Sequence, residues 1–261
     1  MIRYCKFLPG AMVLVLLLLL LAGFSQQALA ANKPKLRFAI SLEIPPFVMD
    51  KAASGLEVSI VRQALGGYDL RFIQLPYEEL QTAVQKKRAD VALGVQPDDS
   101  EIHYSADFVN FVNYAFSKKA AGLRIDSVAD LRGHQVLTWG NAYLELGDEF
   151  EEMFSPQSAQ RKNYIEVADQ MEQVRMFWER KDRIIVIDQN IFIYFSKELG
   201  HDINEVNFSA IFPPVTNFKA GFNDVTVRNQ FNDGLAAMCK SGEYQKLLNR
   251  YGVVAKKTVC E

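Results

Sequence analysis

The sequence is poor in the residues that most reactive sites need. Its 261 residues include three cysteines, three histidines and two tryptophans. His103, His134 and His201 are scattered along the chain, and there is no Gly-x-Ser-x-Gly motif, which would hold a nucleophilic serine on a sharp turn. We therefore expect a protein that is not an enzyme and that carries no cofactor.

The chain also lacks the basic excess that binding to nucleic acid requires. It has 29 Lys and Arg residues against 31 Asp and Glu residues, a formal net charge of −2. A protein with this balance has no strong positive field to attract a phosphate backbone. Nucleic acid is therefore not expected as a partner.

Long apolar runs are missing after residue 30. Before it, Arg3 and Lys6 precede the leucine-rich run 12–21, and Ala28-Leu29-Ala30 has the form of a cleavage site. The run is shorter than the about 20 apolar residues of a membrane-spanning helix, so residues 1–30 are predicted to be a secretory signal peptide. Residues 21–24 contain no cysteine for lipid attachment. Cleavage after Ala30 would leave 261 − 30 = 231 residues, free in the periplasm, with 27 basic and 31 acidic side chains.

The scarce cysteines favour a disulfide. Cys5 would leave with the signal peptide, so Cys239 and Cys260 remain. An even number of cysteines in an oxidising compartment indicates pairing, and a loop of this size contributes about 3 kcal/mol in the chain-entropy account. The alternative is one buried thiol and one thiol in the tail.

Short strand-like runs alternate with helix-like runs along the rest of the chain. In the first half, the patterns predict strands at 36–42, 70–73 and 90–95 and helices at 56–65 and 77–88. A second unit has strands at 135–138, 164–167 and 184–187 and helices at 141–154 and 169–180. A strand at 218–222 precedes two helical stripes, the first capped by Asn223 or Asp224. This order predicts an α/β fold with parallel strands.

The ordered set of short motifs resembles the periplasmic solute-binding proteins of the polar amino-acid type. The resemblance covers nearly the whole chain after residue 30, although no single motif is strong. It is carried by Pro46-Phe47 with Gly55-Leu56-Glu57-Val58, Tyr77-Glu78-Glu79-Leu80, Tyr104-Ser105-Ala106-Asp107, Asp130-Leu131-Arg132-Gly133, Gly140-Asn141-Ala142 and Ser241-Gly242-Glu243-Tyr244.

The resemblance implies two α/β lobes joined by two crossing segments, with the ligand in the cleft between them. Lobe I would hold residues 31–112 and 221–261, and lobe II residues 113–220. The lobes would close around the ligand by a hinge motion. The expected partners are a small-molecule ligand and an inner-membrane ABC permease or a sensor protein, and the chain is expected to be a monomer.

Three candidate ligand contacts follow for lobe II. Gly140 and Asn141 stand where the family offers backbone N–H groups and a threonine hydroxyl to a ligand carboxylate, so asparagine replaces the usual threonine. Asp188 follows the strand at 184–187, at the position that in the family pairs with the ligand's amino group. Both Asn141 and Asp188 have an alternative role as helix caps.

Six further residues are expected to line the cleft. Glu43, Phe47, Tyr77 and Gly94 belong to lobe I, and the aromatic pair Trp139 and Tyr143 flanks the turn at Gly140. Phe47 can equally be a core residue, and either member of the pair can pack within its own lobe.

The loop GVQPDDSEIHYSAD at residues 94–107 departs from the family pattern. The family has an arginine here that grips the ligand's α-carboxylate with two parallel hydrogen bonds, and this chain has none between Arg88 and Arg124. Substitution by Arg62, Arg124 or Arg183 stays open, although their contexts indicate surface positions. The acidic residues at 98–101, with His103, form a solvated loop in our interpretation; metal binding is the alternative, without an EF-hand pattern.

The sequence as a whole predicts an exported binding protein for a small polar or zwitterionic solute. The missing arginine leaves amines, peptides, modified amino acids and aromatic acids open as ligands beside the standard amino acids. A dehydratase of prephenate-like acids, which occurs on the same fold, is the alternative from another functional class.

Overall fold

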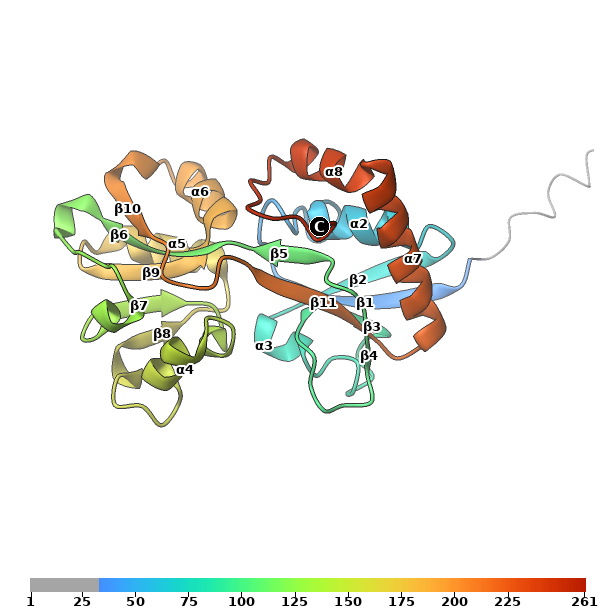
Figure 1. Ribbon diagram of the computed structural model, residues 1–261, viewed down its shortest axis with the longest axis horizontal. Helices are drawn as coiled ribbons and strands as arrows, with labels where there is room; N and C mark the ends of the chain where they lie inside the picture. The colour runs from blue at the N-terminus through green and yellow to red at the C-terminus, as the bar shows by residue number, and fades with distance from the viewer. Residues whose placement is uncertain (1–32) are drawn as a thin grey trace, which may run out of the picture. The chain divides into compact units, whose positions relative to one another are not determined.

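The computed structural model describes residues 33–261, so the predicted signal peptide lies outside the described residues. Its strands form two mixed sheets, each with helices packed around it, and the two assemblies are called lobe I and lobe II below. Figure 1 shows that the chain passes between the two sheets along β5 and β6 and returns along β10 and β11. The α/β, two-lobed fold predicted from the sequence is confirmed.

Lobe I is built on a six-stranded sheet of order β2-β1-β3-β11-β4, with β5 paired to β11. β1 is parallel to β2 and β3, whereas β11 is antiparallel to its partners β3, β4 and β5. Its strands are β1 (Lys35–Ser41), β2 (Asp69–Leu75), β3 (Val91–Val95), β4 (His103–Tyr104), β5 (Val109–Phe111) and β11 (Thr216–Phe222). Its helices are α2 (Leu56–Ala64), α3 (Tyr77–Leu80), α7 (Val225–Ser241) and α8 (Glu243–Tyr251).

Lobe II is built on a five-stranded sheet of order β10-β6-β9-β7-β8. Its strands are β6 (Asn113–Lys118), β7 (Gln135–Thr138), β8 (Tyr164–Glu166), β9 (Arg183–Asp188) and β10 (Val206–Ser209). Its helices are α4 (Asp148–Phe154), α5 (Gln170–Glu179) and α6 (Gln189–Glu198). Short 3-10 helices lie at η2 (Lys119–Ala121), η3 (Val128–Leu131), η4 (Ala142–Leu144), η5 (Arg161–Asn163) and η6 (Ile203–Glu205).

Two predicted helices are shorter than the sequence indicated. The helix predicted at 77–88 is regular only over α3, and the hydrogen bonds that follow it, such as Ala83 N–H to Leu80 O and Arg88 N–H to Ala83 O, have mixed spacing. The helix predicted at 141–154 is divided into η4 and α4, because Gly147 between them has a φ of 96° and begins a new helix. Glycine adopts this backbone region without strain.

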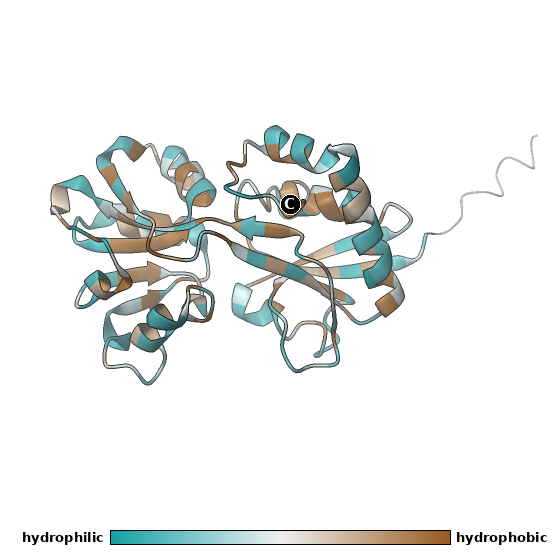
Figure 2. Cartoon of the chain, viewed as in Figure 1, coloured by the Kyte–Doolittle hydropathy of each residue, from teal (hydrophilic) through white to brown (hydrophobic). Residues whose placement is uncertain are grey.

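Apolar side chains of the strands and of the inner helix faces form the core. In Figure 2, hydrophobic residues (brown) are frequent in the strands, and the helices carry both hydrophobic and hydrophilic residues. Aromatic packing is prominent in lobe II, where Phe116 of β6 stacks on Phe192 of α6 with ring centroids 4.0 Å apart. Burial of this apolar surface is the main stabilising contribution to such a fold. Within residues 33–261, no helix is both long and apolar enough to span a membrane.

The start of α2 is fixed by a close backbone approach. Gly55, with a φ of 112°, lies so near the Pro45-Pro46-Phe47 turn that a β-carbon there would stand 2.3 Å from the carbonyl oxygen of Phe47. The N–H groups of Leu56 and Glu57 donate to the carbonyls of Pro46 and Phe47, at 3.0 Å each. These bonds satisfy two N–H groups that a helix start leaves free, and they set the direction of the first turn of α2.

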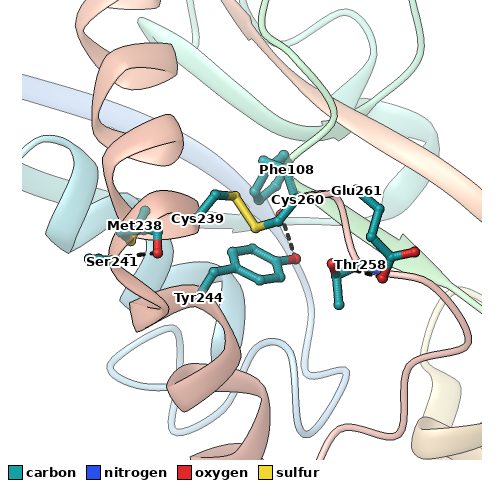
Figure 3. Close-up of a disulfide and its surroundings, with 8 residues drawn as sticks. All are labelled: Phe108, Met238, Cys239, Ser241, Tyr244, Thr258, Cys260 and Glu261. Atoms are coloured by element: carbon teal, nitrogen blue, oxygen red, sulfur yellow. Dashed lines mark hydrogen bonds between the residues drawn. A yellow bond between two sulfur atoms is a disulfide. The ribbon is translucent and has the colours of Figure 1, made fainter.

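The C-terminal tail adds a third connection between the lobes. Cys239 of α7 forms a disulfide with Cys260, with Cα atoms 5.3 Å apart, as predicted from the sequence. Figure 3 shows this bond beside Tyr244. Upstream in the tail, the backbone of Val254 exchanges hydrogen bonds with Asn190 of α6, at 2.9 and 3.3 Å, and accepts another from Gln189 at 3.0 Å. The carbonyl of Lys257 also accepts a hydrogen bond from Asn110 of β5 at 2.9 Å, so the tail is bonded to both lobes.

Candidate functional site

A small cavity lies where the two sheets face each other. The space open to the centre of a water molecule is about 60 Å³. One buried water needs roughly 10–15 Å³ of such space. The cavity therefore suits a small molecule. Four aromatic residues line it, Tyr77, Phe111, Trp139 and Phe218, together with the polar residues Ser41, Glu57, Asn113, Gln170 and Asp188. Both lobes contribute, because β1, β3, α2 and α3 meet β9 and the starts of α5 and α6 here.

Four of the nine residues predicted as ligand contacts line this cavity: Tyr77, Gly94, Trp139 and Asp188. Tyr77 also joins the lobes, because its hydroxyl donates to Oε1 of Glu145 at 3.0 Å. Burial, followed by the charge of Glu145, raises the pKa of Tyr77 well above its usual range. The phenol therefore keeps its proton and acts as a donor.

Asp188 has a structural role as well as a place in the cavity. Its side chain is 2% exposed and accepts backbone N–H groups from Val112 at 2.8 Å, Asn190 at 2.7 Å and Ile191 at 3.2 Å. The last two bonds cap α6, which is the alternative role that the sequence left open, and the first holds the crossing between β5 and β6. Burial raises the pKa of Asp188 to about 6, against the opposing effect of these N–H groups. The carboxylate is thus fixed beside the crossing from β5 to β6.

A second carboxyl group faces the cavity from lobe I. Glu57 is the second residue of α2, is 2% exposed and has no hydrogen-bond partner for its carboxyl group among the described residues. Burial raises its pKa to about 8. A carboxyl group held without a partner in an apolar site is typical of a group that meets a ligand.

Sequence reasoning missed Glu57 as a site residue. An acid in the first turn of a helix has an ordinary explanation, since it complements the helix dipole. The signal that could have found it is its position: Glu57 lies three, four and seven residues before Ile60, Val61 and Ala64, on the face of the helix that packs inward.

Glu43, Phe47 and Tyr143 lie outside the cavity lining. Glu43 accepts the N–H of Lys51 at 2.6 Å, and Phe47 is fully buried against Phe111, with ring centroids 4.4 Å apart. Tyr143 packs within lobe II, beside Tyr164. The core role that the sequence allowed for Phe47 is the one in which the structure places it.

The turn at Gly140 and Asn141 also lies outside the lining. Asn141 adopts a left-handed backbone with a φ of 59° before η4, and its N–H donates to Oε1 of Glu166 at 2.9 Å. The other oxygen of Glu166 pairs with Arg161 at 2.8 Å. The family resemblance assigns the N–H group of Asn141 to a ligand carboxylate. In this structure that N–H group already donates to a carboxylate of the protein, Glu166. A β-carbon on Gly140 would stand 2.8 Å from Glu78 of lobe I, so the lobes approach closely here.

The acidic loop is organised around Asp98, away from the cavity. Its carboxylate accepts hydrogen bonds from Ser100, from the hydroxyl of Tyr104 at 2.7 Å and from Gln81 at 3.1 Å. Partial burial alone would raise the pKa of Asp98, but these bonds outweigh it and lower the pKa to about 2. Within residues 33–261, no group of three His, Cys, Asp or Glu side chains lies close enough to hold a metal ion.

None of the three arginines considered as substitutes lines the cavity. Arg62 donates to the carbonyl of Ala53, Arg124 pairs with Asp126, and Arg183 donates to the carbonyl of Met176. Among the described residues, the lining contains no lysine, arginine or histidine. The carboxylate clamp that the loop lacks is therefore not supplied from elsewhere.

Comparison with known proteins gives a consistent result over most of the described chain. The sequence profile of the bacterial extracellular solute-binding proteins, family 3, matches residues 36–254. The arginine-binding extracellular protein ArtP of Bacillus subtilis is 24% identical, over 88% of this chain and 90% of that protein.

Solved structures show the same fold at lower sequence identity. A histidine kinase sensor domain with similarity to periplasmic binding proteins has a TM-score of 0.71, at 15% identity over 87% of this chain and 99% of that one. A histidine-bound substrate-binding protein of an ABC uptake transporter from Streptococcus pneumoniae has a TM-score of 0.70, at 16% identity over 90% of this chain and 100% of that one.

Proposed function

Because the chain belongs to the bacterial extracellular solute-binding proteins of family 3, we propose that it captures a small, amino-acid-like solute with a cationic group. The site is the cavity between the two lobes. The sequence predicted bounds of 31–112 and 221–261 for lobe I and of 113–220 for lobe II, and β11 of lobe I begins earlier, at Thr216. The family is one of binding proteins and not of enzymes, which agrees with the absence of a nucleophile motif and removes the support for a dehydratase.

The observation that carries this proposal is the composition of the cavity wall. The carboxylate of Asp188 is fixed by three backbone N–H groups, and Tyr77 and Trp139 face the same space. A fixed carboxylate attracts a cationic group, and aromatic rings pack on the body of a small solute. The hydrogen bond from Tyr77 to Glu145 joins the lobes beside the cavity, as expected for a site that closes on its ligand.

Delivery to an ABC permease or to a sensor is the proposed role after capture. The relatives include both kinds of protein, an ABC substrate-binding protein and a histidine kinase sensor domain. Export through residues 1–30 would place the mature chain in the periplasm. A permease gene and an ATPase gene beside this gene would support transport, and mass spectrometry of the secreted protein should give Ala31 as its first residue.

A ligand screen tests the proposal. Purified protein, unfolded and refolded to remove any bound solute, is heated with each standard amino acid, short amines and small organic acids. One compound or one chemical group is expected to raise the melting temperature with its concentration, since a ligand of the native state adds RT ln(1 + [L]/Kd) to stability. Calorimetry then gives the Kd. A panel without any response would contradict the proposal.

A further inference from the structure

We infer that the solute is an organic amine without a carboxylate, a small cation that gives N–H donors to Glu57 and Asp188. This inference rests on the proposed function and names the class of ligand for the same cavity. It follows from an imbalance between hydrogen-bond acceptors and cationic groups in the cavity wall.

Three acceptors in the cavity wall have unused capacity. The carboxyl group of Glu57 has no hydrogen-bond partner among the described residues, and Oε1 of Gln170 is buried without one. Asp188 accepts three N–H groups, whereas a carboxylate has about four acceptor positions. A buried acceptor without a donor costs free energy. A ligand that brings several N–H donors removes this cost.

Groups that would hold an anion are missing from the same wall. Among the described residues, no basic side chain lines the cavity. The N–H group of Asn141 donates to Glu166, whose second oxygen pairs with Arg161. A ligand carboxylate would therefore meet Glu57 and Asp188 without a compensating cation, and two close carboxylates repel each other strongly in a buried site.

The remaining wall also favours a positive charge. Tyr77, Phe111, Trp139 and Phe218 present aromatic rings from both lobes and from both crossing segments. The face of an aromatic ring attracts a cation. Beside the cavity, Glu145 accepts from Tyr77, and Glu78 approaches Gly140 across the gap between the lobes. Both of these contacts between the lobes thus involve an acidic side chain.

Titration of Glu57 connects amine binding to proton release. Its pKa of about 8 means that the empty site holds Glu57 mostly protonated at pH 7, whereas an ion pair with an amine requires the carboxylate. Two other titratable groups, Tyr77 and Asp188, line the same cavity. Tyr244 of α8 is also close, because its pKa is raised first by burial and second by the charge of Glu57. The α7 face that packs beside α2 is apolar: Val227, Phe231, Leu235 and Met238. The two tyrosines keep their protons at pH 7 and Asp188 is mostly ionised, so Glu57 is the group that titrates there.

Matched pairs of compounds test the inference directly. Calorimetry compares ornithine with putrescine, lysine with cadaverine, and arginine with agmatine, because the members of each pair differ only in the carboxylate. At least one amine is expected to bind ten times more tightly than its parent amino acid. Binding of that amine at pH 7 should release close to one proton, measured in buffers of different ionisation enthalpy, since alkylamines keep their own protons until about pH 10.

Glu57→Gln is the matched variant, because glutamine resembles the protonated carboxyl group in shape. It is expected to bind the amine at least ten times more weakly at pH 8 and to release little or no proton. The wild-type affinity should rise about fivefold between pH 7 and pH 8, as a group with a pKa near 8 ionises, and the variant should lose this rise. Glu101→Gln makes the same change on an exposed side chain outside the cavity lining and should behave as the wild type.

The outcomes separate this inference from the proposed function. Tighter binding of an amine, with loss of proton release in Glu57→Gln, supports both. Equal or tighter binding of an amino acid overturns the inference and leaves the proposed function in place. An amine that binds Glu57→Gln as tightly as the wild type also overturns it. If no amine and no amino acid binds, the inference and the proposed function both fail.

Discussion

Replacing Glu57 by glutamine should remove most of the pH dependence of the empty protein's stability between pH 6 and pH 8. Burial raises the pKa of Glu57 from 4.5 to about 8 in the folded state. Between these values the folded state binds the proton and the unfolded state does not. Stability therefore falls as pH rises, because it falls wherever the unfolded state binds fewer protons.

The size of the effect follows from the same two values. Full ionisation of a buried group whose pKa rises from 4.5 to about 8 costs about 5 kcal/mol, at about 1.4 kcal/mol for each pH unit. The part that falls between pH 6 and pH 8 is about 2 kcal/mol. Asp188, whose pKa of about 6 is also raised by burial, adds less than about 1 kcal/mol there, since most of its titration lies lower.

Urea unfolding of ligand-free protein at several pH values measures this slope. The wild type should lose about 2 kcal/mol between pH 6 and pH 8, or roughly 4–8 °C in melting temperature for a chain of this size. Glu57→Gln should lose less than half as much, and Glu101→Gln should match the wild type. An unchanged slope in Glu57→Gln would show that Glu57 is hydrated, and the reasoning about its burial would be wrong.

Three further changes have expected results. Gly234→Ala should destabilise the fold by about 1–3 kcal/mol, seen as a lower urea midpoint, because the new β-carbon would stand 2.6 Å from the Cα of Ala64. Loss of the disulfide in Cys239→Ser should cost about 3 kcal/mol for a separation of 21 residues, measured by the same assay. Tyr77→Phe removes the hydrogen bond to Glu145; because such a bond contributes about 1 kcal/mol, the variant should bind the ligand about fivefold more weakly.

Each of these changes has a control or a contrary outcome. Gly66→Ala adds a β-carbon at an ordinary 3.6 Å contact and should be tolerated; a Gly234→Ala protein that is equally stable would mean that α2 and α7 can move apart freely. If the urea midpoint of the wild type is the same with and without a reducing agent, the disulfide does not contribute about 3 kcal/mol to stability. If Tyr77→Phe binds the ligand as tightly as the wild type, the hydrogen bond between Tyr77 and Glu145 does not contribute to closure of the lobes.

The architecture was predictable where local pattern and tertiary structure agree. The strand predicted at 135–138 is β7, and Asp224 caps α7, as its position before the helical stripe indicated. Agreement fails after α3, where Leu80, Ala83 and Val84 have helical spacing but the regular helix ends at Leu80. There Gln81 exchanges two hydrogen bonds with the backbone of Gln96, a contact that no local pattern contains.

The site was only partly predictable, because several of its residues come from segments without a recognisable motif. Phe111, Asn113 and Phe218 lie in the crossing segments, and they reach the cavity only because β5, β6 and β11 meet there. Asp188 could be predicted because a carboxylate that ends an apolar strand lies at the end of that strand, where the following helix begins. The carboxyl group of Glu57 resembles an ordinary helix-start acid until its burial is known.

The C-terminal tail sets a length limit on any opening of the lobes. Val254 is hydrogen-bonded to α6 of lobe II, and Cys260 is joined covalently to α7 of lobe I. On its other side, Val254 is only three residue steps from Tyr251, where α8 of lobe I ends, and these steps can extend to roughly 10 Å at most, at about 3.3–3.6 Å per residue. Beyond that separation, the bonds at Val254 must break before the lobes move farther. The tail is therefore a tether of defined length, held to lobe I on both sides of Val254.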